Sequence, residues 1–181
     1  MPRSMAQVAG QSNTLDRVVG FVQAAGNVRG GETMTPQERA ERSAAAMWST
    51  DVASQSLDLK LTRIAPGQAT MTMTVRPEHL NGHGICHGGY IFTLADTAFA
   101  YACNSHNKLV VAQENTITFL SPGKPGEVLT ATATEVHLAG RSGVYDALVT
   151  GEDGRKVALF RGLSRQVSGE HFKEKTTEDK A

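Results

Sequence analysis

The sequence has little of what marks several large protein classes. Its 181 residues include only two cysteines, Cys86 and Cys103, which are too few for a disulfide framework. It also lacks a basic excess, because 18 Lys and Arg balance 18 Asp and Glu. Without such an excess, no net positive field would draw the chain to nucleic-acid phosphates. These absences argue against a disulfide-rich secreted protein and against a nucleic-acid-binding protein.

Long apolar runs are missing as well. The longest strongly apolar stretch, residues 90–103, is 14 residues long and contains Asp96, whereas a membrane span needs about 20 apolar residues. Asp16 and Arg17 interrupt the apolar residues 15–22, so they form no signal-peptide core. Apolar residues nevertheless make up 40% of the chain, a normal share for a globular core. The sequence predicts a cytoplasmic protein with one domain of ordinary size.

The chain divides into three parts. Residues 1–34 carry weak signals and are assigned to an N-terminal extension. Thr35, Pro36 and Glu38 form a capping box with proline at the first helical position, which predicts a helix that ends near Thr50. Residues 168–181 hold seven charges and almost no apolar side chains, so we expect a charged flexible tail. The domain itself is predicted to span residues 35–167.

Apolar residues alternate with polar ones over residues 56–62 and again over residues 69–75, which predicts a hairpin around Pro66-Gly67. A helix over residues 87–104 follows, and then four strands near residues 109–121, 126–138, 143–151 and 155–167. No parallel crossover pattern occurs. The predicted fold class is α+β, with an antiparallel sheet of five to six strands, one central helix packed on it and the helix at residue 36 before it.

Asp96 is the one charged residue in the central helix, which is apolar all round. One sheet can cover only one side of such a helix, so a second copy of the protein is the expected cover for the other side, although the helix after Thr35 could cover part of it. Burial of an unpaired carboxylate is costly. Asp96 is therefore either a solvent-facing residue bonded to a hydroxyl such as that of Thr93, or a functional carboxylate; the surroundings favour the second.

The segment before this helix supplies hydrogen-bond donors. Gly88 and Gly89 leave the first helical N–H groups without side-chain cover, and together with the helix dipole they suit a carbonyl oxygen that gains negative charge. Asn81 can add an amide donor. Gly88 and Asp96 are eight residues apart, about 12 Å along one helix at 1.5 Å per residue. We therefore predict a composite site, with Asp96 of one chain near Gly88 of another in an antiparallel pair.

The sequence also offers candidates for a metal site and for a nucleophilic thiol. His79, His83 and His87 have the spacing of metal ligands on a helix, but the surrounding Pro77 and glycines make a helix there improbable, and no metal site is predicted. A nucleophilic thiol at Cys86 would need His87 as its base, but the side chains of adjacent residues rarely point toward each other.

The pattern from Asn81 through His87-Gly88-Gly89 to Asp96 resembles the active-site motif of hotdog-fold acyl-CoA thioesterases of the phenylacetic acid degradation type. The resemblance covers residues 35–167. It implies a long helix wrapped by a curved antiparallel sheet, paired into dimers that often form tetramers. It also implies that Asp96 is the nucleophile or the general base, that the Gly88 N–H polarises the thioester oxygen, and that Asn81 and His87 assist.

Coenzyme A in such proteins runs between subunits, and the resemblance extends this expectation to two turns. Lys124 or Arg141 could meet a phosphate, with ordinary charged turns as the alternative. The expected coenzyme A contacts are Gly89, Ser121, Lys124, Gly140, Arg141 and Ser142.

The function predicted from the sequence is hydrolysis of an aryl- or arylacetyl-CoA thioester, of the phenylacetyl-CoA or hydroxyphenylacetyl-CoA type, to the acid and free coenzyme A. Hydrolysis needs no metal or redox cofactor. One alternative is a non-catalytic module that binds or senses acyl-CoA, which would not need an acid at position 96. A second is a hotdog hydratase or dehydratase, which would use a pair formed by His87 and an acid.

Overall fold

The structure, a computed structural model, describes residues 34–174. The capping box forms as expected: the Thr35 hydroxyl accepts a hydrogen bond from the Glu38 N–H, and the Glu38 carboxylate accepts one from the Thr35 N–H. This box starts helix α2, Pro36–Trp48. Among the described residues, no helix has the length and apolar character needed to cross a membrane.

A short helix occupies part of the first predicted strand. Asp51 caps helix α3, Val52–Ser56, by accepting a hydrogen bond from the Ser54 N–H. Asp58 then takes a positive φ of 52° and redirects the chain. Strand β1 therefore begins only at Lys60 and runs to Ala65. The predicted strand start near residue 56 is wrong because the local cap outweighs the period-two pattern, although Leu59 and Leu61 are buried as expected.

The rest of the order agrees with the prediction. Strand β2 (Gln68–Thr74) and a 3-10 turn, η1 (Pro77–His79), precede helix α4 (Gly88–Asn104), and the last four strands are β3 (Val110–Phe119), β4 (Val128–Ala139), β5 (Ser142–Thr150) and β6 (Lys156–Gln166). All neighbouring strands are antiparallel, in the order β1-β2-β4-β5-β6-β3. The expected sheet thus has six strands, and its edges are β1 and β3.

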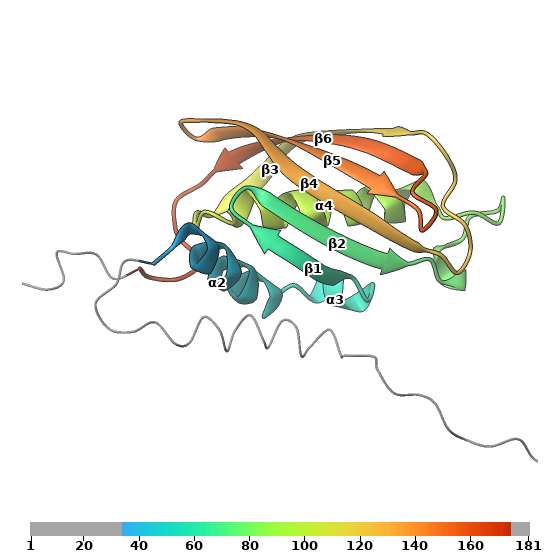
Figure 1. Cartoon of the computed structure of the whole chain (residues 1–181), viewed down its shortest axis with the longest axis horizontal. Coiled ribbons are helices and arrows are strands. Elements are labelled where there is room, and N and C mark those ends of the chain that lie inside the picture. Colours follow the sequence, from blue (N-terminus) through green and yellow to red (C-terminus); the bar gives the residue numbers. More distant parts are fainter. Residues whose placement is uncertain (1–33, 175–181) are drawn as a thin grey trace, which may run out of the picture.

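The sheet curves around α4, which runs along its inner face (Figure 1). Small residues allow this close approach: Ala95, Ala98 and Ala102 are fully buried. Gly162 on β6 lies where an added Cβ would stand 2.8 Å from the Phe99 ring. The other side of the helix is partly covered by α2, since Trp48 packs edge-on to Tyr101 with ring centroids 6.3 Å apart.

Strand β3 contains an irregularity that changes which residues face the helix. Ala112 pairs with Ser164 and Glu114 pairs with Leu163, so Gln113 is an extra residue in a β-bulge. Beyond the bulge, Asn115 stands opposite Gly162. The bulge thereby turns Asn115 toward α4.

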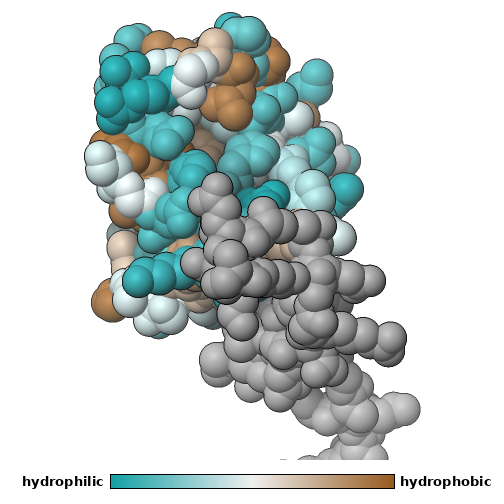
Figure 2. Space-filling model, turned by 90° about the vertical axis from the view of Figure 1, so that its left-hand side faces the viewer, coloured by the Kyte–Doolittle hydropathy of each residue, from teal (hydrophilic) through white to brown (hydrophobic). Residues whose placement is uncertain are grey.

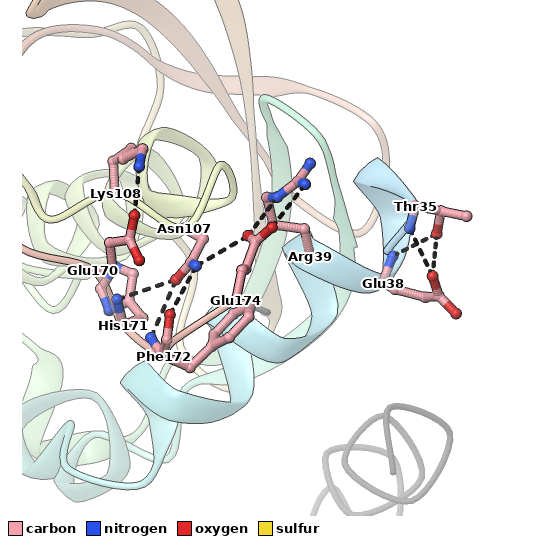
Figure 3. A network of polar contacts seen from close by, with 9 residues as sticks. All are labelled: Thr35, Glu38, Arg39, Asn107, Lys108, Glu170, His171, Phe172 and Glu174. Atoms are coloured by element: carbon pink, nitrogen blue, oxygen red, sulfur yellow. Dashed lines mark hydrogen bonds and ion pairs between the residues drawn. The ribbon is translucent and has the colours of Figure 1, made fainter. Parts of the chain in front are cut away.

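The C-terminal segment differs from the flexible tail that we expected, as far as it is described. The Arg39 guanidinium on α2 donates two hydrogen bonds to Glu174, of 2.6 and 2.9 Å (Figure 3). The Asn107 side chain donates to the Phe172 carbonyl at 2.9 Å, and the Arg42 guanidinium lies 4.2 Å from the Phe172 ring centroid. The carboxylates of Glu170 and Glu174 therefore pair with Lys108 and Arg39 of the domain, and we name residues 170–174 the C-terminal clasp.

Candidate active site

The loop before α4 is folded back on itself. The Asn81 N–H donates to the Ile85 carbonyl, and the Asn81 side-chain oxygen accepts from the His83 N–H, both at 2.9 Å. Among residues 34–174, nothing accepts a hydrogen bond from the Asn81 side-chain NH2. The Cys86 N–H donates to the Gly123 carbonyl at 2.9 Å. The loop is thus held against the turn that follows β3, and the side-chain NH2 of Asn81 is left unused by residues 34–174.

The two glycines at the start of α4 differ from each other. His87 is the N-cap, and its Nδ1 accepts a hydrogen bond from the Gly89 N–H at 2.9 Å. The Gly88 N–H has no acceptor in the described part of the chain. Our expectation that both N–H groups are free is therefore wrong for Gly89, because the His87 ring folds over the helix end. Gly88 supplies the remaining donor.

Phe119 covers the side of Gly88. An added Cβ at Gly88 would stand 2.9 Å from the Phe119 Cζ, closer than van der Waals contact allows. The Phe119 side chain is half exposed, with 50% of its residue surface open to solvent. A half-exposed aromatic ring thus stands directly beside Gly88.

Asp96 lies half-buried in the middle of α4, and Asn115 on β3 donates a 2.6 Å hydrogen bond to its Oδ1. Burial raises the pKa of Asp96, and the hydrogen bond from Asn115 opposes that rise. The Thr93 hydroxyl donates to the Gly89 carbonyl at 2.9 Å, so it is not the partner of Asp96 that we considered. Sequence reasoning missed Asn115, because the strand pattern does not reveal the bulge at Gln113.

Asp96 and Gly88 remain apart within one chain. Strand β3 runs alongside α4 so that Asn115 contacts Asp96 at one point and Phe119 contacts Gly88 at another. Eight helical residues rise about 12 Å and four strand residues about 13 Å, so the two spacings agree. The carboxylate and the free N–H therefore cannot reach one acyl carbon from the same chain.

Two of the residues expected to contact coenzyme A lie in the turn after β3, near the start of α4 (Figure 1). The Ser121 hydroxyl donates its proton to the Lys156 carbonyl at 2.6 Å, so it cannot also donate to a ligand. The Lys124 ammonium pairs with Asp153 at 3.1 Å, so its charge is compensated. A phosphate would have to compete with Asp153 for this ammonium group.

Three more of these six residues, Gly140, Arg141 and Ser142, lie at the opposite end of the sheet, at the turn between β4 and β5, whereas Gly89 is in the first turn of α4. Gly140 adopts a positive φ of 57° there. The Arg141 guanidinium donates to the Gln166 carbonyl at 2.8 and 3.1 Å, and Arg165 donates to the Ser142 hydroxyl oxygen at 3.1 Å. Neither arginine pairs with a carboxylate among residues 34–174. Figure 2 shows this end of the molecule, where hydrophilic surface is mixed with separate hydrophobic patches.

The remaining candidate residues are dispersed. His79 is buried, stacks on Tyr90 with centroids 4.4 Å apart and accepts from the Arg76 N–H, whereas His83 is exposed. The part of the chain that the structure describes has no group of three His, Cys, Asp or Glu residues able to hold a metal ion. Burial raises the pKa of Cys86 to about 11, which leaves its thiol protonated and unreactive at neutral pH.

Comparisons with known proteins show the family of this chain. Residues 83–158 match the family model described as the thioesterase superfamily. The acyl-coenzyme A thioesterase PaaI of Escherichia coli is 46% identical over 131 residues, which cover 72% of this chain and 94% of that protein. A putative esterase of Archaeoglobus fulgidus is 38% identical over 136 residues, covering 75% of this chain and 88% of its own.

Solved structures are similar in fold as well. The structure of the E. coli PaaI protein from the phenylacetic acid degradation operon has a TM-score of 0.74 and 44% identity, covering 75% of this chain and 99% of the other. A hypothetical thioesterase from Streptococcus pneumoniae, solved with coenzyme A, has a TM-score of 0.65 and 26% identity, covering 68% and 98%. Sequence and structure together show that this chain belongs to the thioesterase superfamily and has the hotdog fold.

Proposed function

We propose that this chain is an acyl-CoA thioesterase that acts on aryl- or arylacetyl-CoA. One observation carries the proposal: a half-buried carboxylate and an unused helix N-terminal N–H lie on the same helix, about 12 Å apart. These are the groups that thioester hydrolysis requires, one to activate water and one to stabilise the oxyanion. They serve a single substrate only if two chains combine.

A homodimer would unite them. Gly89, Thr93, Asp96 and Ala100 form a stripe along α4 that is not fully buried within the chain. Next to this stripe, β3 is an edge strand, whose outer backbone groups can pair with a second chain. An antiparallel pair of α4 helices would place Asp96 of each chain near the partner's Gly88. Such a dimer has two equivalent sites, and two dimers would form the expected tetramer.

In the proposed reaction, water attacks the thioester carbon while Asp96 takes its proton. The carbonyl oxygen becomes negative and receives hydrogen bonds from the Gly88 N–H and the unused Asn81 amide. The tetrahedral intermediate then breaks its carbon–sulfur bond and releases the acid and the thiol of coenzyme A, which takes the proton back. Direct attack by Asp96, which would give an anhydride, is the second route. Neither route uses a metal or redox cofactor.

Solvent-oxygen labelling in a single turnover separates the two routes. Label found in the Asp96 carboxylate supports the anhydride, because it enters there only when water attacks the Asp96 carbonyl carbon of that intermediate. Direct attack by water on the thioester puts label in the released acid and none in Asp96.

The same antiparallel pairing would bring Arg141 of one chain toward the Gly88 end of its partner. There its uncompensated guanidinium could bind a phosphate of coenzyme A. Arg165, which donates to Ser142, adds a second positive charge beside it. We therefore propose Arg141 rather than Lys124 as the phosphate ligand.

The preference for an aromatic acyl group is supported by Phe119, whose half-exposed ring beside Gly88 could pack against an aryl ring of the substrate. The name of the E. coli relative points the same way. Nδ1 of His87 accepts the hydrogen bond that caps α4, so the neutral ring carries its proton on Nε2 and has no free basic nitrogen, which weighs against a hydratase that uses His87 as a base.

A panel of acyl-CoA thioesters with a thiol reagent, together with the solution mass, tests the proposed function. We expect release of coenzyme A with the highest kcat/KM for arylacetyl-CoA, and a mass of a dimer or tetramer. A binding or sensing module would release none, and a hydratase would instead add water to enoyl-CoA. Full turnover by a monomer would overturn the composite site.

A further inference from the structure

Only the NH2 group of the Asn115 side-chain amide has a hydrogen-bond partner among the described residues. Its Nδ2 donates to Asp96 at 2.6 Å, whereas its Oδ1 is buried and has no donor among residues 34–174. A buried acceptor without a donor costs stability, because it has lost its hydrogen bond to water and gained none. An apolar side chain of similar size would avoid this cost. Asn115 is therefore poorly explained as a residue that stabilises the fold.

The surroundings of Asp96 give this one hydrogen bond its importance. Burial raises the pKa of Asp96. Among the described residues, the hydrogen bond from Asn115 lowers this pKa, and no charged side chain contributes to the shift. On the same helix, the charge of Asp96 reaches the thiol of Cys103, whose pKa is raised to about 12, mainly by burial. Asn115 from β3 is thus the nearest group that can favour the ionised carboxylate.

Two features of the strands place Asn115 there. The bulge at Gln113 sets its direction, and Gly162 opposite it on β6 leaves room for the Phe99 ring of α4. Because the donor binds Oδ1 of Asp96, the second carboxylate oxygen remains available for a proton.

We propose that Asn115 is the positioning residue for Asp96: its amide N–H holds the carboxylate ionised, with one oxygen free to accept a proton. For its effect on turnover, this inference rests on the proposed function. It extends that function by assigning a residue outside the Asn81–Asp96 motif to the control of the catalytic acid.

The test compares Asn115→Leu and Asn115→Asp with Thr116→Val, a matched control on the exposed outer face of β3. With phenylacetyl-CoA, Asn115→Leu should lower kcat about tenfold or more at neutral pH, with KM changed less than about twofold. The acidic limb of its kcat profile should move to higher pH. Asn115→Asp should be worse, because it replaces the donor with a second carboxylate. Thr116→Val should match the wild type.

Two further readouts keep the outcome decisive. In acid, where the Asp96 carboxyl is protonated, Asn115→Leu should melt at the same temperature as the wild type or higher, whereas a structural role requires a lower one. The titration of Asp96, followed by NMR of 13C-labelled aspartate, should move to higher pH in Asn115→Leu without any substrate present. If it does so in a protein that hydrolyses no thioester, the proposed function fails and the coupling of Asn115 to Asp96 stands. An unchanged Asp96 titration in Asn115→Leu overturns the inference.

Discussion

The Phe119 ring lies against Gly88 so closely that a methyl group on Gly88 would stand 2.9 Å from its Cζ. Gly88→Ala should push the ring aside and disturb the access of a thioester to the Gly88 N–H. We expect kcat/KM to fall about tenfold or more, because small displacements in an active site are expensive. Steady-state kinetics with an arylacetyl-CoA substrate measure this.

Gly82→Ala is the matched control, since no atom lies within 4 Å of a Cβ at Gly82 in the same loop. It should keep kcat/KM within about twofold of the wild type. Equal losses in both variants would mean that the loop, and not the contact with Phe119, determines activity.

Asp96→Asn should abolish most turnover while the fold persists. An amide at position 96 can still bond to Asn115 after the Asn115 amide flips, so far-UV circular dichroism should be unchanged. A tenfold fall in kcat corresponds to about 1.4 kcal/mol of barrier, and we expect the fall to be far larger than tenfold. A smaller loss would show that Asp96 is not the central catalytic group.

The stability of the same variant should depend on pH. Because burial raises the folded-state pKa of Asp96, its contribution to stability is fully present below the unfolded pKa and is lost as pH rises through the folded value. Asp96→Asn should therefore melt at a higher temperature than the wild type at pH 8. This gain should shrink in acid, below both pKa values. Calorimetry at several pH values measures the trend, and a constant difference would contradict it.

Arg141 and Lys124 should differ as ligands for coenzyme A. Loss of the uncompensated charge in Arg141→Gln should raise KM about tenfold, as expected for a charge-assisted hydrogen bond. Lys124→Gln should change KM less than about twofold, because Asp153 already pairs with Lys124. A truncated thioester without the nucleotide should erase the difference between the two variants. The reverse order would transfer the phosphate site to Lys124.

The C-terminal clasp should stabilise α2 against the domain. Glu174→Gln removes the ion pair with Arg39 and should cost about 0.5–1 kcal/mol in urea unfolding. Lys173→Gln is the control, since Lys173 is exposed. Arg39 lowers the pKa of Glu174 in the folded state, so this stability is present above the unfolded pKa and is lost as pH falls through the folded value. A Glu174→Gln variant as stable as the wild type would contradict this role.

Much of the fold can be predicted from the sequence because periodicity and capping are local properties. The start of α2 at Pro36 and of α4 at Gly88 follow from residues adjacent to them. The motif from Asn81 to Asp96 also predicted the family correctly. Where two local signals compete, as at Asp51 and Leu57, the pattern alone does not decide which one wins.

The contacts between distant elements could not be predicted. Asn115 reaches Asp96 only through the bulge in β3, and bulges leave no mark in the alternation of a largely polar strand. Glu174 is close to Arg39 in space but far from it along the chain. The charged composition of residues 168–181 therefore predicted a solvated tail and could not reveal this ion pair. The ring of His87 could equally have pointed away from Gly89.

The β-bulge at Gln113 determines which residue of β3 faces Asp96. If β3 kept all its residues but paired regularly from Ala112 with Ser164, without the bulge, Glu114 would lie opposite Gly162, where Asn115 now lies. Two acids would then face each other between helix and sheet, and one of them would have to hold a proton at neutral pH. Loss of the bulge alone would thus exchange a neutral donor for a second acid.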